Sequence, residues 1–227
     1  MRAFSALLAP WLLLALACSS LPAKAPRVGP GQYLFRVEAR SQEREAHLRV
    51  VLRFAGERRF QIGAADLVGR TVWTFAVAGD HFLWADHRQR KVCRGEASEA
   101  LALPLLQLEL SPGAVPQILL GALPIAIPAE AAKGTDGRVR FVDGAGHHWL
   151  AGVDSHDELR EWQMSDSTGR TIATWQRDGG TSELALPQRE LTLRWRQASA
   201  EPLPGDWAPF ATPDGFEECG CDQLDLP

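Results

Sequence analysis

Apolar and polar residues alternate with a period of two along most of the chain. Every second residue is apolar in segments 33–39 and 46–54, and the residues between them are mostly charged. Because successive side chains of a strand point to opposite faces, each segment predicts a strand with one buried and one solvent-facing side. The break at residues 55–57, followed by apolar residues at 60 and 62, predicts a hairpin into a third strand.

The same pattern continues through the rest of the chain. Short clusters of Gly, Asp and Ser separate the apolar runs at the close spacing of a meander. A mainly β protein with consecutive antiparallel strands is therefore expected. Further strands are predicted at residues 71–77, 81–85, 91–94, 139–141, 149–153, 162–164, 172–175 and 191–195.

One stretch, residues 98–126, interrupts the strands. It is rich in Leu, Ile, Val and Ala and almost free of charge. Ser111 and Pro112 are typical of a helix start and Gly121 of a helix end, so a short helix is predicted within residues 114–120. We expect this apolar insertion to lie across the open side of a curved sheet.

The N-terminus has the pattern of an export signal. A short basic start precedes an apolar run, residues 4–17, that is too short to span a bilayer as a helix. Ala17 directly before Cys18 resembles the lipobox of bacterial lipoproteins, in which the cysteine is lipidated and becomes the first mature residue. By that resemblance, Ser19 implies sorting to the outer membrane. The alternative is an ordinary secretory signal cleaved near Ala17, with Cys18 a plain thiol.

These signals divide the chain into four parts. Residues 1–17 are the predicted signal peptide, and residues 18–31 are a tether rich in Ser, Pro, Gly and basic residues. Residues 32–200 form the predicted domain, and residues 201–227 form a tail with a Cys-Gly-Cys sequence. The expected location is a lipid anchor in the outer membrane of a Gram-negative bacterium, facing the periplasm.

Export would place Cys93, Cys219 and Cys221 in an oxidising compartment. Three thiols cannot all pair within one chain. A small ring between Cys219 and Cys221 and a link from Cys93 to either tail cysteine are both open. No metal is expected, because the tail pair lacks a second pair or suitably spaced histidines to complete a zinc site.

Charge and motifs argue against several function classes. The formal net charge of −4 gives no field that would attract nucleic acid. The sequence holds no nucleophile elbow, metalloprotease motif, phosphate-binding loop or dinucleotide fingerprint. We therefore expect neither catalytic residues nor a cofactor, and a protein that is not an enzyme.

Tryptophan is unusually frequent in the chain. Eight tryptophans occur against one tyrosine, and one of the eight lies in the leader. They either pack as ordinary core residues or, together with Phe35, Phe54 and Phe75, line a cavity that holds an apolar ligand. Composition leaves both interpretations open.

The order of parts resembles the LolA/LolB-like group of periplasmic lipoprotein carriers and receptors. The loop at residues 66–70, the Leu-Leu-Gly-x-x-Pro ending at 119–124 and the Leu-Pro-then-strand element at 186–193 carry this resemblance. It implies an incomplete barrel, that is, a strongly curved antiparallel sheet with helices over its open side and a hydrophobic cavity for acyl chains. It also implies that Leu67 or Val68 forms a membrane-insertion loop. The expected cavity residues are Phe35, Leu52, Phe54, Trp73, Phe75, Trp84, Leu119 and Leu120.

Two functions remain. The first is a membrane-anchored protein that binds acyl chains or other apolar ligands in its sheet cavity, as a receptor in lipoprotein localisation to the outer membrane. Its partners would be the membrane, through the lipid anchor, and acyl chains or lipoproteins as cargo, with no nucleic acid. The second is a structural or interaction lipoprotein of the cell envelope that uses the same fold with a filled interior.

Overall fold

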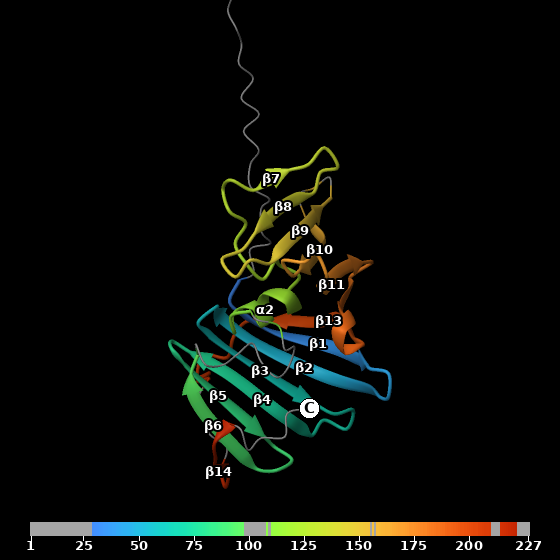
Figure 1. Cartoon of the computed structure of the whole chain (residues 1–227). Helices are drawn as coiled ribbons and strands as arrows, with labels where there is room; N and C mark the ends of the chain where they lie inside the picture. The colour runs from blue at the N-terminus through green and yellow to red at the C-terminus, as the bar shows by residue number, and fades with distance from the viewer. Residues whose placement is uncertain are drawn as a thin grey trace, which may run out of the picture.

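A computed structural model of the chain describes residues 29–97, 108, 110–154, 156, 158–209 and 214–221. Within these residues the chain forms one sheet of 14 strands, of which only one pair is parallel (Figure 1). The predicted mainly β, largely antiparallel fold is thus confirmed. The strands are β1 (Gly31–Arg40), β2 (Glu45–Gly56), β3 (Arg59–Ala65), β4 (Thr71–Ala78), β5 (His81–Asp86), β6 (Lys91–Glu96), β7 (Ala132–Lys133), β8 (Val139–Val142), β9 (His148–Val153), β10 (Leu159–Ser165), β11 (Thr171–Asp178), β12 (Thr181–Leu186), β13 (Leu191–Glu201) and β14 (Glu217–Glu218).

Two meanders joined side by side make up the sheet. Strands β1 to β6 follow one another in space as in sequence, and so do β7 to β13. The long strands β1 and β13 pair antiparallel in the middle and join the two halves. The interruption between β6 and β7 is the apolar insertion predicted from the sequence, so the break in alternation marks the change from one meander to the next.

The strong curvature expected from the family resemblance is not found. The sheet is open, because its edge strands β14 and β7 lie at opposite ends of the strand order and do not pair with each other. Each of these edge strands is only two residues long, so neither offers a ladder that could close a barrel. The sheet is therefore a wide, twisted layer (Figure 1), as the right-handed twist of antiparallel strands produces.

Helix α2 (Ala114–Leu119) lies within the range predicted for it. It begins after Gly113 and has no side-chain cap, so the hydroxyl cap expected at Ser111 is wrong. Its last turn ends at Gly121, where φ is +76° and an added Cβ would collide with the guanidinium of Arg177. Only glycine satisfies both conditions without strain. A single 3-10 turn, η1 (Pro187–Arg189), connects β12 and β13.

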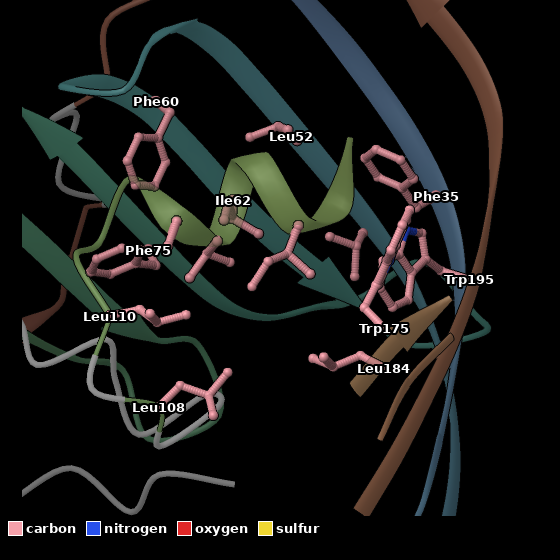
Figure 2. Close-up of a cluster of buried hydrophobic side chains, with 14 of the residues drawn as sticks. Phe35, Leu52, Phe60, Ile62, Phe75, Leu108, Leu110, Trp175, Leu184 and Trp195 are labelled. Carbon is pink, nitrogen blue, oxygen red and sulfur yellow. The ribbon is translucent and has the colours of Figure 1, made fainter. Parts of the chain in front are cut away.

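The hydrophobic core gathers on the face of the sheet that α2 covers. Figure 2 shows side chains of both meanders, among them Phe35, Ile62, Phe75 and Trp175, around this helix. All four are at most 1% exposed and belong to one continuous buried cluster. The two halves of the sheet therefore share a core, and α2 contributes Val115 and Ile118 to it.

Aromatic rings from neighbouring strands form a row in the second meander. Phe141 stacks on Trp149, Trp149 contacts Trp162, and Trp162 stacks on Trp175, with ring centroids 6.2, 5.5 and 6.5 Å apart. The three tryptophans are at most 2% exposed. Ordinary core packing therefore accounts for these three, which was one of the two interpretations that composition left open.

Four hairpin turns share one construction. Each begins with an aspartate whose Oδ1 accepts hydrogen bonds from backbone N–H groups two and four residues later: Asp66, Asp143, Asp154 and Asp166. Such side-chain bonds satisfy turn N–H groups that no strand partner reaches. The turn signals rich in Asp and Gly are thus explained by backbone geometry.

Asp143 also anchors the aromatic row. Its Oδ2 accepts a hydrogen bond of 2.8 Å from the indole N–H of Trp149 and lies 3.1 Å from Nδ1 of His147. Burial alone would raise the pKa of Asp143, but hydrogen bonds from Trp149 and His147 outweigh it and lower the pKa. Because this pKa is lower in the folded state than in the unfolded state, the ionised carboxylate of Asp143 stabilises the fold at pH values above the unfolded-state pKa. That stabilisation is lost as the pH falls through the folded-state pKa.

We expect Asp143→Ala to lower the free energy of unfolding by about 1–3 kcal/mol at neutral pH, because it leaves buried donors without an acceptor. The difference from the wild type should shrink as pH falls below about 4. Urea denaturation at a series of pH values measures both. Asp166→Ala is the matched control, since Asp166 is also half-buried and accepts the same backbone bonds but has no bond from an indole. Equal losses for the two variants would contradict the anchoring of Trp149.

Candidate functional site

An apolar hollow of about 110 Å³ lies between the sheet and α2. Side chains of β1, β2, β3, β4, β12 and β13 line one side, among them Val37, Leu48 and Trp195. Val115, Ile118 and Leu119 of α2 line the other. No polar side chain lines the hollow. An apolar cavity of this kind favours apolar ligands over water, because water needs polar partners.

The structure separates the eight expected cavity residues into three groups. Trp73 and Leu119 line the hollow. Half-buried Leu120 follows α2 and packs against the core. The other five are buried in the packed core next to the hollow: Phe35, Leu52, Phe54, Phe75 and Trp84.

Sequence reasoning missed most of the lining residues. Val37 and Ala39 follow Phe35 at intervals of two on β1, and Leu48 and Val50 precede Leu52 in the same way on β2. Alternation therefore places them on the same inner face. The larger aromatic residues of that face were expected to line the cavity, whereas the hollow lies beside the smaller aliphatic residues.

Few polar contacts hold α2 in place over the hollow. The indole N–H of Trp195 donates to the carbonyl of Leu119 over 2.9 Å. Nη2 of Arg177 donates to the carbonyl of Leu120 over 3.3 Å. Gln117 donates to Glu57 over 2.9 Å on the exposed side. Among the described residues, these three bonds and the burial of Ala114, Val115, Pro116 and Ile118 hold the six-residue helix over the hollow.

The loop between β3 and β4 exposes two large apolar side chains. Leu67 is 64% and Val68 is 77% exposed. Asp66 fixes the loop by accepting bonds from the N–H groups of Val68 and Arg70, over 3.1 and 2.9 Å. The side chain of Arg70 donates to the same carboxylate over 2.8 Å. Both apolar side chains are thus presented to solvent on a well-braced turn.

A second loop shows that the turn does not require these apolar residues. Residues 166–170 read Asp-Ser-Thr-Gly-Arg, whereas residues 66–70 read Asp-Leu-Val-Gly-Arg. Both loops close with the same backbone bonds, from the aspartate N–H to the arginine carbonyl and from the glycine N–H to the aspartate carbonyl. Since Ser167 and Thr168 build the same turn, Leu67 and Val68 are there for something other than turn geometry.

The tail is fixed to the edge of the first meander by a disulfide between Cys93 and Cys221. Cys219 is free among the described cysteines. Cys18, the signal peptide and the tether up to residue 28 lie outside the described residues. In the part of the chain that is described, no helix is long and apolar enough to cross a membrane. The same residues contain no cluster of His, Cys, Asp and Glu arranged to hold a metal ion.

Comparison with known proteins identifies the fold. No family model matches the sequence, and no curated protein does. A LolA superfamily protein from Nitrosomonas europaea superposes with a TM-score of 0.52 at 9% sequence identity, covering 79% of this chain and 89% of that one. A domain proposed to be an outer membrane lipoprotein-sorting protein, from Vibrio parahaemolyticus, gives 0.48 at 10% identity, covering 78% and 86%. The expected resemblance to the LolA/LolB-like group is thus confirmed at the level of the fold.

Proposed function

We propose that this protein is an envelope lipoprotein, anchored through Cys18, that takes the acyl chains of lipidated cargo into the hollow under α2 and passes them to the outer membrane. The observation that carries this proposal is the hollow itself: an unfilled, wholly apolar space beneath a short helix on a LolA-like sheet. Its lining offers nothing that a polar ligand could use.

The size of the hollow indicates how loading would proceed. Ligand pockets are usually about 300–1,000 Å³, so a partly open hollow of about 110 Å³ holds only part of an acyl chain. Outward movement of α2 would break the polar contacts described above for Gln117, Leu119 and Leu120, and it would open the space between Val115, Ile118 and the sheet. Each methylene group that leaves water then contributes about 0.8 kcal/mol.

Release needs no nucleotide and no catalytic residue. The cargo moves on when a bilayer buries its acyl chains more completely than the hollow does, so transfer runs downhill in free energy. Leu67 and Val68 would enter the membrane surface and place the hollow near it. The Cys93–Cys221 disulfide supports an oxidising compartment outside the cytoplasm. The segment that follows Cys18 would serve as the tether to the lipid anchor.

The test is extraction of bound lipid from purified, unacylated protein, followed by mass spectrometry. We expect the wild type to carry acyl lipid, and Ala39→Phe to carry almost none, because the ring fills the hollow that Ala39 lines. Ala200→Phe is the control, since Ala200 is an exposed residue of β13 that does not line the hollow. Equal lipid content in Ala39→Phe and the wild type would contradict the proposal.

One observation favours the alternative function, a structural or interaction lipoprotein. Five of the eight expected cavity residues are packed in the core, so most of the interior is filled by the protein itself. A wild-type protein that carries no lipid, together with a loss of stability in Ala39→Phe that Ala200→Phe does not show, would support this alternative.

A further inference from the structure

A row of arginines crosses the sheet where β2, β1 and β13 lie side by side. Arg36 of β1 stands directly opposite Arg49 of β2 and Arg196 of β13. The next residues along these strands, among them Val50 and Trp195, are buried on the side of the core. The three arginine side chains therefore point to the outer face, spaced by about 5 Å from strand to strand.

These three guanidinium groups lack counter-charges. Among the described residues, no carboxylate lies within salt-bridge distance of Arg36, Arg49 or Arg196, and all three are exposed. The adjacent row is different, because Arg194 pairs with Glu183 over 3.1 Å. Like charges directly opposite each other destabilise a sheet. The stability of the fold therefore gives no reason for this arginine row.

The arginine row and the exposed loop border the same groove. Arg36, Arg49, Arg196 and Leu67 all line this depression of about 510 Å³ on the surface. The whole chain carries a net charge of −4, so the row concentrates positive charge on an otherwise acidic protein. Basic residues beside exposed apolar ones are the combination that binds a membrane surface.

We propose that the arginine row docks on the negatively charged phospholipid head groups of a bilayer while Leu67 and Val68 enter the boundary of the acyl region. Guanidinium groups bind phosphate oxygens in bidentate pairs, and three in a line match the many phosphates of a membrane surface. A free phosphate would use one or two of them and leave Leu67 and Val68 in water. The inference rests on the proposed function for the membrane location and does not involve the hollow.

The test compares vesicles of phosphatidylcholine alone with vesicles that also contain phosphatidylglycerol. The mature chain from position 18, with Cys18→Ser to prevent acylation, is sedimented with each. We expect stronger binding to the anionic vesicles, which weakens as salt is added. The variant Arg36→Gln/Arg49→Gln/Arg196→Gln should bind them roughly a hundredfold more weakly, from about fivefold for each arginine. Its melting temperature should be unchanged or higher, because the repulsion within the row is removed.

The control variant is Arg58→Gln/Arg138→Gln/Arg160→Gln. It removes the same charge from arginines that pair with Asp80, Glu161 and Asp154 elsewhere on the sheet. Equal binding by the two triple variants would overturn the proposal, and so would full competition by glycerol phosphate, which would indicate a site for soluble phosphate. Lipid extraction with Ala39→Phe tests the hollow separately, so a negative vesicle result leaves acyl binding standing.

Discussion

The double variant Cys219→Ser/Cys221→Ser is expected to lower the free energy of unfolding by about 5 kcal/mol. The Cys93–Cys221 bond joins residues 128 positions apart, so it encloses more than half of the chain in one loop. In the chain-entropy account, closing such a long loop restricts the unfolded state strongly and thereby favours the folded one. Urea denaturation without a reducing agent, with the wild type as reference, measures the loss.

Both tail cysteines are replaced because Cys219 could otherwise take the place of Cys221 opposite Cys93. Cys219→Ser alone is the control and should stay close to the wild type, since Cys219 is free. Adding a reducing agent to the wild type should bring it to the stability of the double variant. If the double variant and the control unfold at the same urea concentration, the disulfide does not stabilise the fold.

The variant Leu67→Ser/Val68→Thr is expected to keep the fold and lose delivery to the membrane. It gives the loop at residues 66–70 the sequence that already builds the same turn at residues 166–170, so the backbone bonds should persist. The only large change is the loss of two apolar side chains from the surface. In cells depleted of the protein, the wild type should restore lipoprotein sorting and this variant should not.

The reciprocal variant Ser167→Leu/Thr168→Val is the control for this experiment. It places the same apolar pair on the loop at residues 166–170. When it is combined with Leu67→Ser/Val68→Thr, lipoprotein sorting should still not be restored. Circular dichroism and lipid content should be equal in all these proteins, which separates delivery from folding and from loading. Full rescue by Leu67→Ser/Val68→Thr would remove the loop from the mechanism.

Much of the fold could be predicted from the sequence because a strand shows its two faces directly in the alternation of residues. Segments 33–39 and 46–54 fall within β1 and β2, and the apolar insertion contains α2. The shape of the sheet could not be predicted in this way. The alternation of apolar and polar residues indicates which face of a strand is buried. Closure of the sheet depends on its edge strands, and β7 and β14 are too short to show any alternation.

The candidate site was harder to predict for a related reason. Phe35 and Val37 are both apolar residues on the inner face of β1, yet Phe35 is packed in the core and Val37 lines the hollow. The difference depends on where α2 lies above β1, which is a long-range contact that no local pattern encodes. The arginine row was missed because each arginine alone reads as an ordinary solvent-facing residue. Only the register of β2, β1 and β13 brings Arg36, Arg49 and Arg196 into line.

The attachment of β14 beside β6 also bears on how this protein avoids self-association. Glu217 and Cys219 donate backbone hydrogen bonds of 2.9 Å to the carbonyls of Arg90 and Val92, so the tail occupies groups that an edge strand would otherwise leave open. Unpaired edge groups of that kind recruit strands from other molecules. Breaking the Cys93–Cys221 bond would loosen this cover, and reduced protein should therefore aggregate through β6 before the rest of the sheet has unfolded.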